Sequence, residues 1–151
     1  MPADSDALPA LPHTWRPFGA RIAGGLFGAM LLVVCAAAWF GFDEETRARF
    51  TGFQRGTLVF LGLIAASAMY ALVRSRVVAT ESGLVVVNGY VRHEYEWAEI
   101  VAVHLPPGAP WVTLDLSDGT TVSALGIQGS DGDRARHAVR DLRRIVDGSS
   151  A

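Results

Sequence analysis

Two long runs without a charged residue constrain the folding of this 151-residue chain more than any other feature. Residues 22–42 and 56–73 are uncharged throughout and mostly apolar. At about 1.5 Å per helical residue, these runs would reach about 31 Å and 27 Å as helices, close to the roughly 30 Å hydrocarbon core of a bilayer. The sequence therefore predicts two transmembrane helices, with spans of about 22–42 and 56–73.

The segment between the two runs predicts a hairpin and its orientation. Residues 43–55 are rich in charge and short enough to join two antiparallel helices, so both chain ends fall on one side of the membrane. Basic residues flanking the spans on that side are Arg16, Arg21, Arg74 and Arg76, against Arg47, Arg49 and Arg55 in the link. Because basic residues favour the cytoplasmic side, we expect a multi-pass protein of the cell (plasma) membrane with both termini cytoplasmic.

A cleaved signal peptide is the alternative for the first run, which follows basic residues and contains small residues at 36–38. The length of the run and its continuation through Trp39 and Phe40 favour an uncleaved span. A lipoprotein signal at Cys35 is disfavoured, because Val34 stands where a small residue is required. As the single cysteine, Cys35 forms no internal disulfide. Residues 1–14, with three prolines among small and acidic residues, predict a disordered tail.

A stripe of small residues runs along the first span. Ala20, Gly24 and Gly28 recur at every fourth position, a spacing that lets helix backbones approach closely. The stripe indicates a helix–helix contact, or else it reflects how common Gly and Ala are in membrane helices. The sequence leaves both interpretations open.

From residue 74 onward the pattern becomes that of short strands joined by turns. Six strands are expected, over residues 76–80, 84–87, 90–97, 100–105, 111–117 and 120–125. Asn88-Gly89 and Asp118-Gly119 are hairpin turns. An amphipathic helix follows, with Ser130 and Asp133 as a capping box at its start. Residues 148–151 form a short tail.

The order of these parts resembles a known group of proteins. The residues that carry the resemblance are the segment 78–84, the element Trp97-Ala98-Glu99-Ile100, Trp111, the turn Asp118-Gly119 and the closing helix. They resemble the small bacterial membrane proteins with a pleckstrin-homology-like (PH-like) domain, in particular the actinobacterial family named after low-molecular-weight protein antigen 6. The resemblance implies an α+β fold: a transmembrane hairpin over residues 15–73, then an antiparallel PH-like β-barrel over residues 74–147. The barrel would have six to seven strands, with 125–127 as a short last one, and would be closed by the C-terminal helix.

Charge argues against two ligand classes. The net charge of -2 gives no field that attracts nucleic acid. Glu81 makes the tip of the first hairpin acidic, so phosphoinositide binding there is not expected. The last helix carries Arg136, Arg140 and Arg143, which either contact anionic lipid or form a solvated helix face.

No catalytic or metal-binding pattern stands out in the sequence. Glu94 and Glu96 alternate away from His93 along one strand, and His104 lies on the next strand, so a metal site is not expected. Neither a nucleophile elbow nor a phosphate-binding loop occurs. We expect neither cofactor nor enzymatic activity.

A binding role is therefore the main functional expectation. Trp111 shares a strand face with polar residues and marks a possible interaction surface. We expect a non-enzymatic integral membrane protein whose PH-like domain binds an as yet unknown protein or peptide at the membrane. A structural subunit assembled through the transmembrane helices and a module that contacts anionic lipid are the alternatives.

Overall fold

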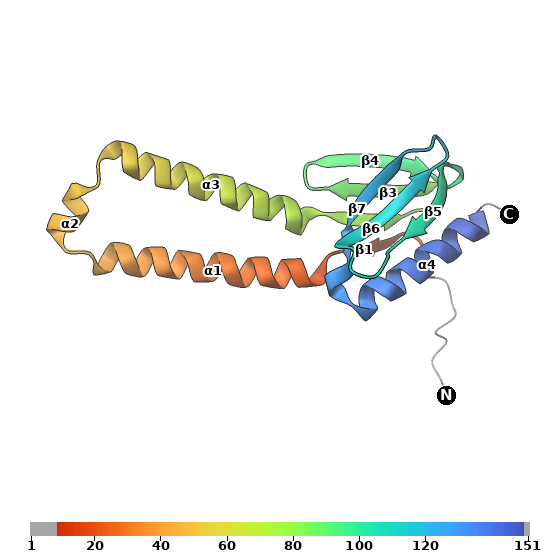
Figure 1. The fold of residues 1–151 in the computed structure, drawn as a ribbon, viewed down its shortest axis with the longest axis horizontal. Coiled ribbons are helices and arrows are strands. Elements are labelled where there is room, and N and C mark those ends of the chain that lie inside the picture. Colours follow the sequence, from red (N-terminus) through yellow and green to blue (C-terminus); the bar gives the residue numbers. More distant parts are fainter. Residues whose placement is uncertain (1–8, 150–151) are drawn as a thin grey trace, which may run out of the picture.

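The computed structural model describes residues 9–149 and shows a long helical hairpin with a compact domain at one end (Figure 1). The hairpin consists of α1 (Phe18–Gly41), the short α2 (Glu44–Arg49) and α3 (Gly52–Arg74). Both long helices begin four residues before the predicted spans. The described part of the predicted tail is residues 9–14; residues 1–8 and 150–151 lie outside the description.

The hairpin helices expose their apolar side chains instead of burying them. Only 6% of the most apolar window of α1 is buried, and none of that of α3. The core helix of a soluble protein would bury most of such a surface. Both helices are long and apolar enough to cross a membrane, and hydrocarbon is the environment that suits their exposed side chains.

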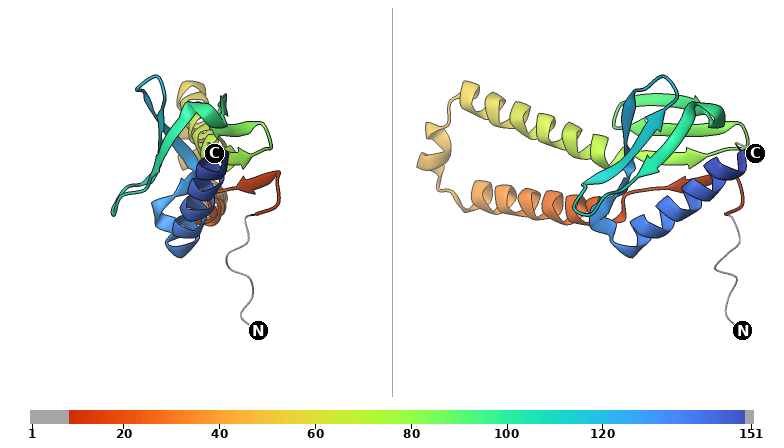
Figure 2. Two further views of the ribbon diagram at one scale, coloured as in Figure 1. Left: turned by 90° about the vertical axis from the view of Figure 1, so that its right-hand side faces the viewer. Right: turned by 45° about the vertical axis from the view of Figure 1, so that its right-hand side comes forward.

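The domain contains two antiparallel sheets. The first has the order β1 (His13–Trp15), β2 (Arg76–Ala79), β3 (Gly83–Asn88) and β4 (Val91–Glu96). The second has the order β5 (Ile100–His104), β6 (Trp111–Leu116) and β7 (Thr121–Gln128). The 3₁₀ turn η1 (Trp97–Glu99) joins the sheets, while η2 (Gly129–Asp131) leads into α4 (Asp133–Ser149). Figure 2 shows the sheets facing each other, with α4 beside them.

The predicted closed barrel is wrong, because the two sheets stay separate. The chain leaves β4 through η1 before β5 begins, so these consecutive strands do not pair. β7 packs across β2 and β3 instead. Gly126 allows this close approach, since an added Cβ would collide with the backbone of Arg76.

The predicted disordered tail does not extend through residues 13 and 14, which belong to a strand. His13 and Thr14 form β1 with Trp15, pairing with Ala79, Val78 and Val77 of β2, respectively. Burial explains this order, because Trp15 packs against the core and Pro17 is fully buried. The seventh strand thus precedes the hairpin. The predicted short strand 125–127 is the end of β7.

One core fills the space between the sheets and α4. Its fully or almost fully buried apolar residues include Val77, Leu84, Val86, Val112, Leu114 and Leu142. α4 begins later than predicted, at Asp133, after Gly132 with φ of 59°. Ser130 lies in η2, so the predicted capping box does not form.

Candidate functional site

The domain is attached to the hairpin by a helix cap that comes from a distant part of the chain. Pro17 precedes α1 and offers no side-chain cap. The carboxylate of Asp131 accepts hydrogen bonds instead, from the backbone N–H of Phe18 (2.9 Å) and of Gly19 (2.7 Å). A carboxylate at this position satisfies free N–H groups and opposes the helix dipole.

A second contact strengthens the same junction. The guanidinium carbon of Arg134 lies 4.0 Å from the centre of the Phe18 ring, a cation–π distance. Strand β1, the cap and this contact together hold the start of α1 against the domain. The domain is therefore fixed at the end of the hairpin by several independent contacts.

The turn between β3 and β4 lies against the end of α3 (Figure 1). The Tyr90 hydroxyl is 2.8 Å from the Ser67 hydroxyl and donates to the Ser67 carbonyl at 3.0 Å. The backbone N–H of Gly89 donates to the Ser75 hydroxyl at 3.0 Å. Gly89 adopts φ of 62° and lies close to Ala71. The predicted Asn88-Gly89 turn is shifted by one residue, because Asn88 pairs with Val91 and the two-residue loop is Gly89-Tyr90. These contacts hold one end of β4 beside the hairpin.

Strand β4 is an edge strand with both faces largely uncovered. It pairs with β3 alone within the described sheet. Five of its six residues are exposed and Tyr95 is half-buried. β7 crosses β2 and β3 and leaves β4 largely uncovered. An uncovered edge strand offers free backbone groups to another extended chain.

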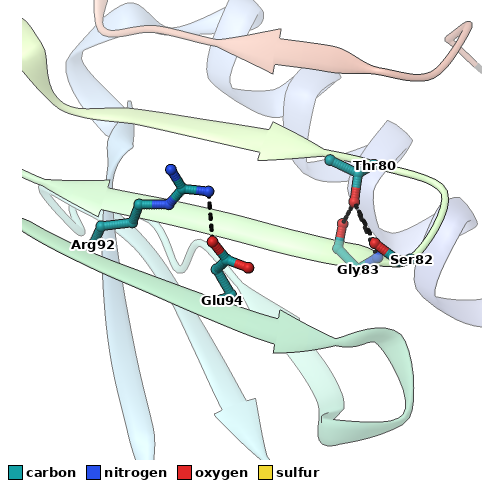
Figure 3. Close-up of polar contacts among 5 residues, drawn as sticks. All are labelled: Thr80, Ser82, Gly83, Arg92 and Glu94. Atoms are coloured by element: carbon teal, nitrogen blue, oxygen red, sulfur yellow. Dashed lines mark hydrogen bonds and ion pairs between the residues drawn. The ribbon is translucent and has the colours of Figure 1, made fainter.

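Charged and aromatic side chains alternate along β4. On one face Arg92 forms an ion pair with Glu94 (Figure 3). On the other face the rings of His93 and Tyr95 stack with centres 6.1 Å apart. The pKa of Tyr95 is raised, first by burial and then by the nearby charges of Glu99 and Asp118.

The loop opposite this strand end is well ordered by hydrogen bonds. The Thr80 hydroxyl donates to the Gly83 carbonyl at 2.8 Å and lies 3.2 Å from the Ser82 hydroxyl (Figure 3). A shallow pocket of about 430 Å³ lies here, and its acidic lining residues are Glu94, Glu96 and Glu99. Such surroundings favour a cationic ligand over a phosphate.

The structure does not bring Trp111 and the helix arginines into one site. The indole N–H of Trp111 donates to the Ser123 hydroxyl at 3.0 Å, within the β6–β7 pair, and 37% of the residue is exposed. Arg143 donates from Nε to the Val103 carbonyl at 2.8 Å and so links α4 to β5. Trp111 remains a candidate contact residue, whereas Arg143 has a structural partner.

The other two predicted arginines interact within α4. Arg136 forms an exposed ion pair with Asp133 at 2.9 Å. The Arg140 guanidinium lies 2.7 Å from Nδ1 of His137. α4 begins beside the start of α1 and runs away from the hairpin (Figure 1). Its first turn is therefore nearest to the hairpin helices, and Arg140 lies farther away.

The middle residue of the small-residue stripe, Gly24, packs against the other long helix of the hairpin. Gly24 is buried, and an added Cβ would collide with the sulfur of Met69 on α3. Ala20 and Gly28 are half-buried, and a Cβ at Gly28 would meet no atom within 4 Å. Gly24 thus serves a contact inside the chain, while the surface beside Gly28 remains open.

His104 approaches Asp115 with 2.8 Å between Nε2 and Oδ2, on neighbouring strands β5 and β6. Within residues 9–149, His, Cys, Asp and Glu side chains form no group of three or more that could hold a metal ion.

Sequence reasoning missed Asp131 and Arg134 as junction residues. It assigned a capping role at the start of α4 to the neighbouring Ser130 and Asp133, but that capping box does not form. The available signal was Pro17 directly before α1, because proline offers no side-chain cap and leaves the first N–H groups of the helix without a local partner.

Comparison with known proteins bears on the C-terminal half of the chain. Residues 74–145 match the sequence model of the bacterial PH domain family. The chain is 33% identical over 86 residues to an uncharacterised protein of Mycobacterium bovis and to one of Mycobacterium tuberculosis. The match covers 57% of this chain and 56% of each relative, so the chain spans just over half the length of the curated relatives it matches. No solved structure matches significantly. The predicted resemblance is confirmed: residues 74–145 of this chain are similar to the bacterial PH domain.

Proposed function

We propose that this chain is a membrane-anchored protein whose PH-like domain binds an extended segment of a partner protein by adding it as a strand beside β4. The uncovered edge of β4 is the observation that carries the proposal. Strand addition to an open sheet edge is a recurrent mode of peptide recognition. The proposal takes the domain to be a binding module without enzymatic activity.

The geometry of the β3–β4 hairpin supports a usable edge. Asn88 and Val91 close a two-residue hairpin, so this pair exchanges backbone hydrogen bonds and every second pair after it does the same. The N–H groups of Arg92, Glu94 and Glu96 therefore point away from β3. Those of Arg92 and Glu94 are available to an added strand, whereas that of Glu96 donates to the Glu99 carboxylate at 2.7 Å.

Charge favours a basic partner segment. Glu94, Glu96 and Glu99 gather at the far end of the strand, and Arg92 is already paired with Glu94. An incoming segment with Lys or Arg would complement these carboxylates, which steers binding and fixes its register. The Tyr90–Ser67 contact holds the other end of β4 beside the hairpin, which supports a partner that is itself bound to the membrane.

We further propose that the first span is retained and that both termini are cytoplasmic. Retention is supported by β1, because cleavage after α1 would remove this strand from the sheet and Pro17 from its buried position. The excess of arginines beside the domain supports the orientation.

The test places a photocrosslinking amino acid at Arg92 and, as a control, at Val101, which is 64% exposed on β5. In native membranes, adducts from position 92 should map to one extended, basic segment of one partner. Glu94→Pro removes an outward N–H and should abolish the adduct, whereas Glu94→Ala should preserve it. Equal labelling from both positions, or an unchanged adduct in the proline variant, would refute strand addition.

A structural subunit assembled through the helices is the second candidate. The helices diverge towards α2 (Figure 1), and a cavity of about 690 Å³ lies between them. Its lining is almost entirely apolar and includes Leu32, Cys35, Ala38, Leu58 and Val59. Filling it with Ala38→Leu should dissociate a complex on a native gel if a partner helix occupies this space, and should leave the β4 adduct intact.

A further inference from the structure

A second pocket lies at the junction between the hairpin and the domain, away from β4. We propose that it binds the phosphate of an anionic phospholipid from the surrounding bilayer. The pocket has a volume of about 270 Å³ and is formed by the β1–α1 segment, the end of β7 and the first turns of α4. Three arginines line it: Arg16, Arg21 and Arg134. The inference is independent of partner binding at β4.

The balance of charge in this pocket favours an anion. Asp131 is its one acidic lining residue, and both its carboxylate oxygens accept hydrogen bonds from the α1 backbone. Arg16 and Arg21 are exposed, and neither forms an ion pair with another residue in the described part of the chain. Their guanidinium groups remain available for a phosphate, which they match in geometry.

Packing fixes the third cation in place. The Arg134 guanidinium lies over the Phe18 ring, and Ala135 and Ala138 beside it are buried in the core. Arg134 therefore cannot leave the junction without losing this contact. A cation held in position costs less conformational entropy on binding than a free side chain.

The position of the pocket, next to the start of the uncharged run of α1, favours a lipid as its occupant. The uncharged run of α1 begins at Ile22, one residue after Arg21. The pocket thus lies where headgroups meet hydrocarbon, with Trp15 and Phe18 as aromatic residues at the same level. A phospholipid can place its phosphate between the arginines while its chains lie along the exposed surface of α1.

The first arm of the test measures lipid retention. The full chain is reconstituted in nanodiscs of phosphatidylglycerol and phosphatidylcholine, and lipids that stay bound are identified by native mass spectrometry. Wild-type protein should retain phosphatidylglycerol preferentially. R16Q/R21Q should lower that preference at least about fivefold, and R92Q/R140Q, which removes the same charge elsewhere, should leave it unchanged. Far-UV circular dichroism should show the same fold for both variants.

Three results would overturn the proposal. Retention in R16Q/R21Q could equal that of the wild type, or both double variants could lose it equally, which would indicate general charge attraction. In the second arm, lipid-free protein in detergent is titrated with inorganic phosphate. Saturable binding that R16Q/R21Q abolishes would assign the pocket to free phosphate instead of a membrane lipid.

Discussion

The carboxylate of Asp131 accepts a hydrogen bond of 2.7 Å from the backbone N–H of Gly19, although 112 residues separate them in the sequence. A residue of η2, between β7 and α4, thereby caps the first helix of the hairpin. The space is tight, because a Cβ added to Gly19 would press against the Asp131 carboxylate. The domain is thus docked on the hairpin and does not hang from it on a flexible linker.

Loss of this cap should weaken the whole assembly. Asp131→Ala leaves the N–H groups of Phe18 and Gly19 without their partner and should cost about 0.5–2 kcal/mol, as helix caps do. Urea unfolding in detergent, followed by tryptophan fluorescence, measures the change. Asp147→Ala, at the exposed far end of α4, is the matched control. A midpoint equal in both variants would contradict a capping role.

The contact between the two long helices should make Gly24 and Gly25 respond differently to the same substitution. Gly24→Leu should clash with Met69 and destabilise the hairpin by about 1–3 kcal/mol, the usual cost of overpacking. Gly25→Leu should have little effect, because an added Cβ there meets no atom within 4 Å. Thermal unfolding in micelles compares the two. Equal melting temperatures would show that the helices do not pack through Gly24.

The core should respond strongly at the centre of α4. Leu142 is fully buried, so Leu142→Ala creates a cavity and should destabilise the domain by about 2–5 kcal/mol. Val101→Ala changes a residue that is 64% exposed and should cost far less. Chemical denaturation of both variants gives the difference. A loss below that of Val101→Ala would mean that α4 is not packed as described.

The turn at Asp118 should make a small, pH-dependent contribution to stability. The Thr120 hydroxyl and backbone N–H donate to its carboxylate, at 2.7 and 2.8 Å, and lower its pKa below 3.8. A lowered folded-state pKa stabilises the protein above the ordinary pKa, and this contribution is lost as the pH falls through the lowered value. Asp118→Asn should therefore reduce stability at pH 7 more than at the acid end of the titration. A difference that grows towards acid would contradict this sign.

The proposed orientation predicts which positions a membrane-impermeant thiol reagent reaches. In a Cys35→Ser background, Ser117→Cys on the exposed β6–β7 turn should stay unlabelled in intact cells and react after lysis. Arg49→Cys in α2 should react from outside. Labelling of Ser117→Cys in intact cells would reverse the topology.

Local patterns in the sequence predict the helices and most strands of this fold. The uncharged runs around Cys35 and Ile64 and the turns at Gly89 and Gly119 have direct counterparts in the structure. The sequence does not predict β1, because this strand has only three residues, lies between Pro12 and Pro17, and is too short to show the alternation that marks a strand. Its order comes from a distant partner, the edge of β2.

Relationships between distant segments account for the other differences. Whether two sheets close into a barrel depends on pairing between strands, and nothing within β4 or β5 encodes that they stay apart. For the same reason, Asp131 cannot be recognised as a cap for α1 from its own neighbours. The sequence marks Trp111 and Arg143 as candidate contact residues by their type and position alone. Their actual partners, the Ser123 hydroxyl and the Val103 carbonyl, are set by tertiary structure.

The pairing of β1 with β2 also has a consequence for how the protein is made. β1 leaves the ribosome first, but Val77, the partner of Trp15, follows only after the whole hairpin has been synthesised. Packing α1 against α3 brings these ends together and lowers the entropy cost of closing so long a loop. The first sheet can therefore be completed only after α3 has been made, so its assembly depends on the hairpin.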